Sequence, residues 1–269
     1  LLVLPPISLA PGGHDVSHTS TPPLGLGMVG SCLLADGHDV HLADCHRTPS
    51  LAGLVMESAP HFQWIGFNTV LPSMRSTLQM ASKIKQAVPT PAVVVGGPAV
   101  NAGAFRNAVQ SPEEATSWDF AINARAEENF AFLVASAARG DTLLPHGIDA
   151  NERSALVLGA GHRSDSARPD AKTDRWPDPI LLDRRLFSTP KGQYEPQPTR
   201  AIHSTTVEAH IVMSRGCDWN CSFCTERRDQ SGGERRRALH SVERELHELT
   251  LGHENLRVQF IDDNLLPQI

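Results

Sequence analysis

The sequence predicts an α/β protein in which a doubly wound, flavodoxin- or Rossmann-like domain precedes the start of a β/α barrel. Short apolar runs alternate with helical patterns through residues 1–140, as in a parallel sheet built from βαβ units. Residues 141–200 are rich in proline with scattered charges, which predicts an extended connector. A strand–loop–helix–strand order returns over residues 201–269 and is typical of the first unit of a β/α barrel.

The first domain begins with a strand at residues 1–4, which Pro5-Pro6 closes. The long Gly/Ser/His loop that follows, residues 7–21, is unusual for a βα connection and is therefore a candidate ligand loop. Pro22-Pro23 then opens a helix that ends at Gly37. Glycines in this helix would let a backbone or a ligand approach closely.

Four more strands and an edge strand complete the predicted sheet. The fourth strand of the sheet, at residues 92–95, is wholly apolar, as a central parallel strand should be. In such a sheet the ligand binds at the carboxyl ends of the strands. We expect the strands at residues 40–42, 64–68, 92–95 and 120–122, and the edge strand at 156–158.

The last part of the chain predicts a strand at residues 210–213, a helix at 241–251 and a strand at 256–261. Asp262-Asp263-Asn264 follows that last strand, where either a direct role at a site or simple capping of the next loop fits the residue types.

Composition excludes several classes of function. A formal charge of −6 leaves no electrostatic footprint for nucleic acid or an anionic membrane. No apolar run approaches the ~20 residues that span a bilayer, and the start lacks a signal-peptide pattern, so we predict a cytoplasmic protein. The chain lacks an initiating Met and stops just after a motif, so we expect a fragment.

Three of the five cysteines, Cys217, Cys221 and Cys224, fall within eight residues. Thiolates suit iron–sulfur clusters or zinc, and three ligands are one too few for a closed site. A [4Fe–4S] cluster held by three cysteines would keep one iron open for a small molecule. Zinc with His210 or His240 as fourth ligand, or inert cysteines including a disulfide pair, remain the alternatives.

The Cys-x3-Cys-x-aromatic-Cys spacing resembles the radical S-adenosylmethionine (SAM) family, with Phe223 at the aromatic position. The resemblance implies that Cys217, Cys221 and Cys224 hold a [4Fe–4S] cluster and that Phe223 packs near the SAM adenine. In that family the open iron chelates SAM, which an electron then cleaves to a 5′-deoxyadenosyl radical. The basic run at residues 235–237 fits a solvated face better than a clamp for the SAM carboxylate.

Residues 1 to about 140 resemble the cobalamin-binding domain that precedes many radical SAM cores. The resemblance lies in Pro22-Pro23-Leu24-Gly25-Leu26, the Asn68-Thr69…Ser73 loop and Gly96-Gly97-Pro98, in that order. As turn chemistry alone, Gly96-Gly97 could equally be a tight turn. The cobalamin contacts that the resemblance implies are Pro23, Gly25, Asn68, Thr69, Ser73, Gly96, Gly97 and Glu127.

Two departures from that pattern matter. The family often has Gly-Glu-Gly-Glu after the fifth strand, whereas this chain has Ala124-Arg125-Ala126-Glu127, in which only the last residue matches. Asp44-Cys45-His46 comes close to a cobalt-ligand motif, but it follows the second strand instead of the first. We therefore expect no histidine on cobalt and a solvated surface position for His46.

Together the resemblances imply a cobalamin-dependent radical SAM enzyme, most simply a methyltransferase that passes a methyl group from SAM through methylcobalamin to an unactivated carbon or a phosphorus. The same cofactors could instead serve cyclisation, ring rearrangement or oxidation. A cobalamin-binding or regulatory module, and a radical SAM enzyme that has lost cobalamin, are further alternatives. We expect a small-molecule or peptide substrate and an external flavodoxin- or ferredoxin-type electron donor. The sequence singles out no catalytic residue, and we expect these 269 residues to be inactive alone.

Overall fold

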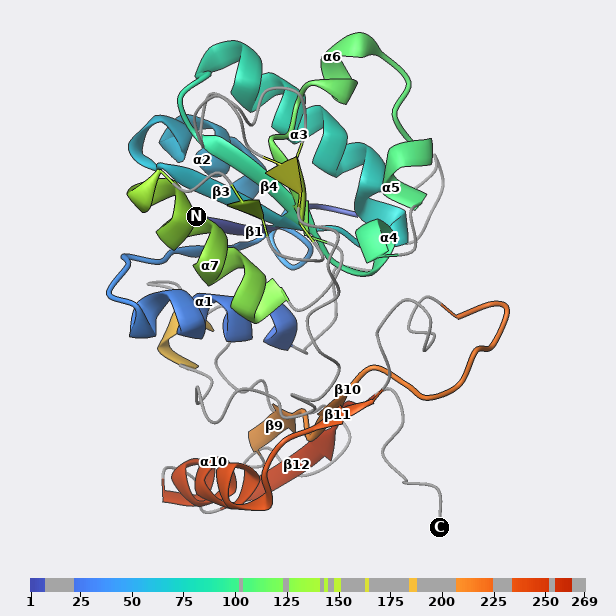
Figure 1. The fold of residues 1–269 in the computed structure, drawn as a ribbon. Coiled ribbons are helices and arrows are strands. Elements are labelled where there is room, and N and C mark those ends of the chain that lie inside the picture. Colours follow the sequence, from blue (N-terminus) through green and yellow to red (C-terminus); the bar gives the residue numbers. More distant parts are fainter. Residues whose placement is uncertain are drawn as a thin grey trace.

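The computed structural model describes residues 1–7, 22–101, 104–122, 126–140, 143–144, 148–150, 163–164, 184–187, 207–224, 234–251 and 255–262. Figure 1 shows a larger α/β unit and, below it, a smaller unit built from the last part of the chain. Among the described helices, none combines the length and apolarity that crossing a membrane requires.

The larger unit is a six-stranded sheet in the order β2-β1-β3-β4-β5-β7. Its first five strands are parallel, and β7 pairs antiparallel with β5. The predicted α/β fold with a parallel sheet is confirmed. The strands are β1 (Leu2–Leu4), β2 (Leu42–Asp44), β3 (Trp64–Asn68), β4 (Ala92–Gly96), β5 (Phe120–Ile122) and β7 (Ile148–Ala150).

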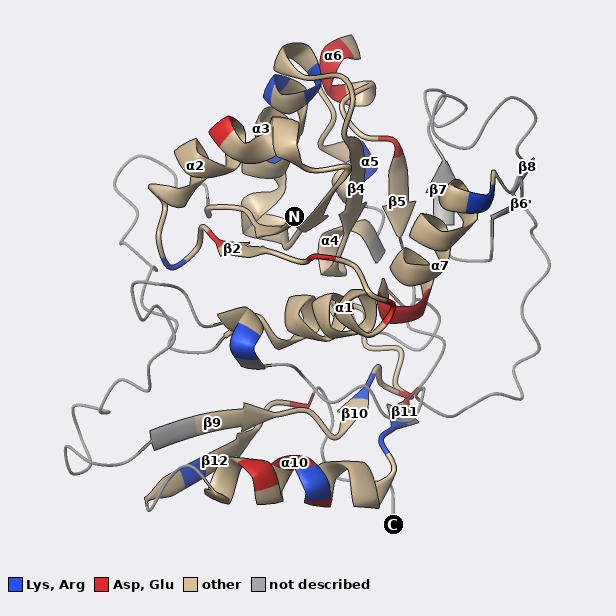
Figure 2. Cartoon of the chain, turned by 90° about the vertical axis from the view of Figure 1, so that its left-hand side faces the viewer, with Lys and Arg blue, Asp and Glu red and all other residues tan. Residues whose placement is uncertain are grey.

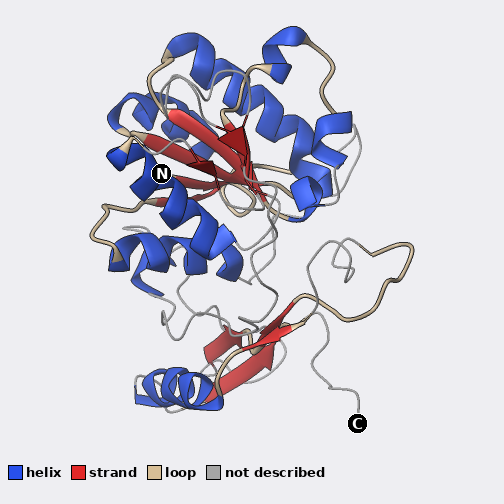
Figure 3. Ribbon diagram, viewed as in Figure 1, coloured by secondary structure: helices blue, strands red, loops and turns tan. Residues whose placement is uncertain are grey.

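Helices cover both faces of this sheet (Figure 3). Successive residues of a strand point to opposite faces, so Val93 and Val95 pack in one core while Val94 packs in the other. α2 (Leu51–Ser58) and α3 (Met74–Ala87) line the first core, and α1 (Leu24–Ala35) and α7 (Ala126–Arg139) line the second. Short elements complete the unit: η1 (Ala59–His61), η2 (Leu71–Ser73), α4 (Pro98–Asn101), α5 (Ala104–Asn107) and α6 (Pro112–Ala115).

Gly66 sets how closely α7 approaches the sheet. A Cβ atom built on Gly66 would lie 2.5 Å from Cε1 of Phe130 and 3.0 Å from Cδ2 of Leu2. Both neighbours are buried. Because Gly66 has no side chain, the Phe130 ring can pack directly against the backbone of β3.

The ion pair between Arg75 of α3 and Glu114 of α6 ties two helices at one end of the unit. The Nη2–Oε1 distance is 2.7 Å and the Nη1–Oε2 distance is 3.0 Å, so the contact is bidentate. The hydrogen bonds from Arg75 lower the pKa of the Glu114 carboxyl. The pair therefore stabilises the packing of α6 while that carboxyl is ionised.

The smaller unit is a parallel pair of strands, β9 (Val207–Ile211) and β12 (Leu256–Phe260), with helix α10 (Leu239–Leu251) packed on it. Ala209, Ile211, Val242 and Leu249 form its buried core. A short antiparallel hairpin, β10 (Ser214–Arg215) with β11 (Arg235–Arg236), lies beyond the carboxyl end of β9. The remaining described elements are β6 (Leu143–Leu144), which pairs with β8 (Arg163–Ser164), and η4 (Arg184–Phe187).

Several sequence predictions need correction in detail. The second strand lies at residues 42–44 instead of 40–42, and the strand before the cysteines lies at 207–211 instead of 210–213. Helix α2 and the short helices between residues 98 and 115 were not predicted. The predicted edge strand at residues 156–158 and the candidate ligand loop fall outside the described residues, apart from Ile7.

Candidate functional site

The cysteine loop leaves the β10–β11 hairpin, whose two strands tie its ends together. Ser214 pairs with Arg236, and Arg215 pairs with Arg235. Gly216 then takes a φ of +75°, a left-handed conformation that favours glycine, and it turns the chain toward the first cysteine. The backbone N–H of Glu234 donates to the Asp218 carboxylate at 3.1 Å, which adds a second tie at the base of the loop.

The three cysteines all lie on this loop as free thiols, Cys221 exposed and the other two half-buried. The N–H of Cys224 donates to the carbonyl of Cys221 at 3.1 Å, which forms a turn. Phe223 is 89% exposed beside them. Within the described part of the chain, no three His, Cys, Asp or Glu side chains converge closely enough to hold a metal ion. The structure thus places the predicted ligands on one loop, at the end of a strand, without gathering their sulfurs.

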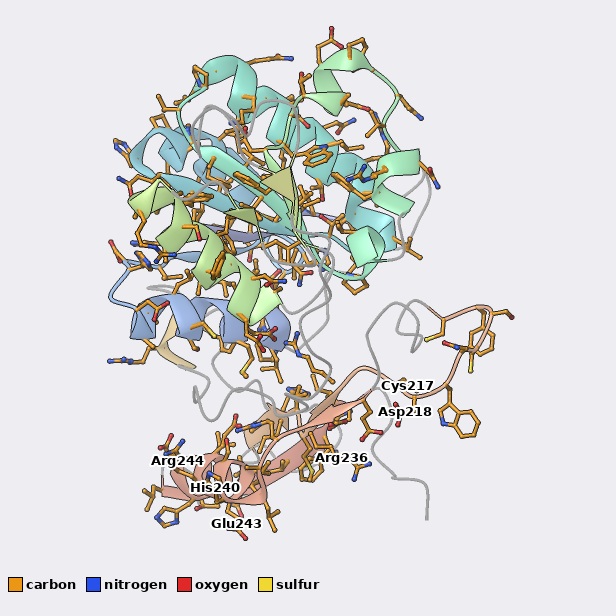
Figure 4. All side chains as sticks on the ribbon, in the orientation of Figure 1. Cys217, Asp218, Arg236, His240, Glu243 and Arg244 are labelled. Atoms are coloured by element: carbon orange, nitrogen blue, oxygen red, sulfur yellow. The ribbon has the colours of Figure 1, made fainter. Side chains whose placement is uncertain are left out.

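Neither of the two histidines considered as a fourth zinc ligand lies with the cysteines. His210 is buried in β9, and its Nε2 lies 3.2 Å from Oε1 of Gln259 in β12. Figure 4 shows His240 on α10, well separated from Cys217 and Asp218 at the start of the loop. Three cysteines that neither His210 nor His240 approaches match the donor chemistry of an iron–sulfur cluster with one open iron better than that of a structural zinc ion.

Asp262, just after β12, holds the chain on the way to the cysteine loop. Its Oδ1 accepts hydrogen bonds from the N–H of Met213, at 2.9 Å, and from the N–H and the hydroxyl of Ser214. The first Asp of the predicted Asp262-Asp263-Asn264 run therefore fixes a neighbouring strand end. The other two residues lie outside the described part.

Arg237 anchors the other side of the same hairpin. Its Nη1 lies 2.6 Å from Oε2 of Glu245 in α10, and both side chains are only 5% exposed. The guanidinium also donates to the carbonyls of Val212 and Ser241. The expectation of a solvated basic face is therefore wrong for Arg237, because its charge is buried and paired, whereas the Arg236 side chain is half exposed.

In the larger unit, the predicted Asn68-Thr69 and Gly96-Gly97 segments meet at the carboxyl ends of β3 and β4. The N–H of Thr69 donates to the Gly96 carbonyl at 2.7 Å. Gly97 has a φ of +97°, and a Cβ atom there would lie 2.2 Å from Oδ1 of Asn68. These loops lie beside the β1/β3 position where the strand order reverses, which is where doubly wound sheets bind ligands.

The hydroxyl groups of this region have partners within the protein. Thr69 and Ser73 are fully buried. The Thr69 hydroxyl lies 3.3 Å from that of Thr77, and the Ser73 hydroxyl donates to the Val70 carbonyl at 3.2 Å. Their observed role is to hold the loop after β3 in shape.

His46 lies just past β2, where its N–H donates to Oδ1 of Asp44 at 2.9 Å. The side chain is partly buried, and its Nε2 has no partner among the described residues. Burial lowers the pKa of this imidazole. The expectation that His46 is a solvated surface residue is therefore wrong in part, because its side chain is partly buried.

The two remaining cysteines are chemically distinct from the loop thiols. Cys32 in α1 and Cys45 after β2 are both buried. Burial, assisted by neighbouring carboxylates, raises the pKa of each thiol to about 12. Both are therefore protonated, inert side chains of the core at neutral pH.

The first turns of α1 and α7 face the hairpin that carries the cysteine loop. Nη1 of Arg215 in β10 lies 2.6 Å from Oε1 of Glu127 in α7. A Cβ atom on Gly25 in α1 would lie 3.3 Å from Nη2 of the same arginine. In Figure 2 the acidic start of α7 lies directly above the basic hairpin.

Apolar contacts accompany this ion pair. Leu24 and Met28 of α1 form a buried cluster with Phe187 of η4, and Val212 and Ile261 of the smaller unit pack against it. Sequence reasoning missed this contact, although Leu24 and Met28 lie in the helix predicted after Pro22-Pro23.

Comparison with known proteins finds a family match in the larger unit and relatives over most of the chain. Residues 14–112 match the B12 binding domain model. The chain is 28% identical, over 98% of its own length, to an uncharacterized methyltransferase of Pyrococcus horikoshii and covers 53% of that protein.

Two solved structures of the radical S-adenosylmethionine methyltransferase TsrM from Kitasatospora setae are similar in fold. One has tryptophan substrate and the SAM analogue aza-SAM bound, and the other has cobalamin and a [4Fe–4S] cluster bound. Each aligns with a TM-score of 0.58 and 16% identity over 97% of this chain and 47% of TsrM. The chain therefore spans about half the length of the proteins that it resembles.

Proposed function

We propose that the chain is the cofactor-binding part of a cobalamin-dependent radical SAM methyltransferase acting on an unactivated carbon, or a phosphorus, of a biosynthetic substrate. The observation that carries the proposal is the joining of two features. A B12-binding sheet lies on one side, and a three-cysteine loop at the end of parallel strands lies on the other. The methyltransferase relative and the fold of TsrM support the same assignment.

The proposed cluster ligands are Cys217, Cys221 and Cys224, with Phe223 beside the SAM adenine. When bound, the cluster with SAM would supply a radical, and cobalamin would supply the methyl group. The chain's own part is to fix the loop through the hairpin, Asp262 and Arg237, so that the thiols and the larger unit keep a defined separation.

For cobalamin we propose the carboxyl edge of the sheet next to β1 and β3. The residues proposed to approach it are Pro23, Gly25, Asn68, Thr69, Ser73, Gly96, Gly97 and Glu127, of which all but Glu127 lie within the matched B12-binding segment. Because Thr69 and Ser73 hold the loop internally, their contribution would come mainly from shaping that edge. We further propose a small-molecule or peptide substrate and a flavodoxin- or ferredoxin-type electron donor.

Labelled methyl transfer tests the reaction. The full-length protein, loaded anaerobically with both cofactors, is incubated with methyl-deuterated SAM, a reductant and candidate substrates. A product that carries one labelled methyl group is expected. SAM cleavage with a product of altered structure but no labelled methyl would instead favour cyclisation or oxidation. The Cys221→Ala variant is the matched control and should abolish SAM cleavage.

A further inference from the structure

We infer that Arg215 and Glu127 form a positioning pair that fixes the cysteine loop against the B12-binding domain. The inference rests on the proposed function, because it assigns the pair to the spacing between the two cofactor sites. Arg215 stands two positions before Cys217, and Glu127 stands in the first turn of α7. The pair therefore joins the two units directly at the proposed cluster site.

The contact is one of close opposite charges, because Oε1 of Glu127 has no hydrogen-bond partner among the described residues. The Nη1–Oε1 distance is 2.6 Å, and the side chains of Arg215 and Glu127 are 28% and 6% exposed. A carboxylate buried to this degree is costly to leave unpaired. Any movement that separates the two units must therefore break the pair or carry Arg215 along.

Gly25 leaves space for the guanidinium. A Cβ atom on Gly25 would lie 3.3 Å from Nη2 of Arg215, close enough that the arginine would have to shift. The guanidinium thus lies between the first turns of two helices of the same domain, one offering a carboxylate and the other an open backbone. Glu127 thus provides the opposite charge for Arg215, and Gly25 leaves the space that its guanidinium occupies.

The arginine is also held at its own backbone. Ser214, the preceding residue, is bonded to Asp262, and Arg215 itself pairs with Arg235 across the hairpin. The residue that follows, Gly216, turns the chain into the loop. Because the backbone of Arg215 is fixed by the smaller unit and its side chain by the larger one, the position of Cys217 depends on both.

The distance between the two cofactor sites matters for the proposed reaction. A methyl group passes from one site to a substrate that is activated at the other, and this transfer requires the reacting atoms to be nearly in contact. A misplacement of about 1 Å can lower a rate by ~10²-fold. We therefore expect loss of the pair to lower methyl transfer more than it lowers cofactor binding. Because the Glu127 carboxylate lies against Arg215, we assign it to this pair in place of the cobalamin contact proposed for Glu127, which would have the opposite signature.

The experiment uses the full-length protein with Arg215→Gln, Glu127→Gln and the exchanged pair Arg215→Glu/Glu127→Arg. Both single variants should keep their iron and corrinoid. The number of labelled methyl groups that they transfer per SAM cleaved should fall by about tenfold or more. The exchanged pair should recover part of that ratio. Arg236→Gln, on the same hairpin but half exposed, is the matched control and should match the wild type.

Hydrogen exchange of the hairpin amides provides a measurement that needs neither cofactor nor substrate. Both single variants should exchange faster than the wild type at residues 214–216, and Arg236→Gln should not. Unchanged exchange in Arg215→Gln, or corrinoid loss in Glu127→Gln alone, would overturn the inference. A wild-type protein that binds neither iron nor corrinoid would refute the proposed function instead, and the exchange result would still decide the role of the pair.

Discussion

Replacing Arg237 by Met removes the buried cation that joins the hairpin to α10. The arginine contacts the Glu245 carboxylate at 2.6 Å, the Val212 carbonyl at 3.0 Å and the Ser241 hydroxyl at 3.0 Å. Methionine keeps most of the apolar stem but none of these bonds. It leaves the Glu245 side chain, which is 5% exposed, without its counter-charge.

Breaking a buried ion pair from one side costs about 3–5 kcal/mol. Since each ~1.4 kcal/mol is a factor of ten in an equilibrium constant, opening of the smaller unit should rise by about 10²- to 4 × 10³-fold. Hydrogen exchange of the β9 and β12 amides measures this opening directly, without requiring the whole chain to unfold in one step.

The neighbouring arginine is the control. Arg236 pairs with Glu234 at the same 2.6 Å. Its own side chain is 50% exposed, although that of Glu234 is only 8% exposed, so Arg236→Met removes a partly solvated cation and should cost less than Arg237→Met. Equal exchange rates in the two variants would refute the argument that burial determines the contribution of each pair.

Two further predictions concern the larger unit. Gly66→Ala should destabilise it by about 1–3 kcal/mol, because the new methyl group would meet the Phe130 ring. Gly53→Ala, on an open helix surface, is the control and should be neutral or slightly stabilising. Urea titration of both variants measures the difference in stability. Glu114→Gln should lower the midpoint of unfolding at pH 7, and the difference from the wild type should shrink as the pH falls below 4.5. The sign follows from the lowered pKa of Glu114 in the folded state, which makes the contribution of its pair with Arg75 present above that pH and lost below it. A difference that does not change with pH would contradict this account.

The sequence was most informative where one short stretch carries the physical signal. β4 is wholly apolar because it is buried on both faces, and this pattern placed it within one residue of its observed end. The order of the Asn68-Thr69 and Gly96-Gly97 loops likewise placed them at one edge of a parallel sheet, where the structure brings them together.

Contacts between distant segments were not predictable in the same way. The Arg237 side chain is buried because Glu245 lies two turns along the next helix and Val212 lies just after β9, and neither fact is visible in a run of three arginines. Arg215 stood beside the cysteine motif, but its partner Glu127 belongs to another domain. The two-residue error in β2 arose because Val40 preceded the strand and looked like part of it, whereas it packs as a partly buried loop residue.

The central claim is most directly tested by the metal content of the anaerobically purified full-length protein. We expect about four iron atoms and one corrinoid per chain. The Cys217→Ala/Cys221→Ala/Cys224→Ala variant should lose the iron and keep the corrinoid, because the two cofactors are assigned to different units. Zinc in place of iron, or a folded protein that retains no corrinoid, would contradict the account.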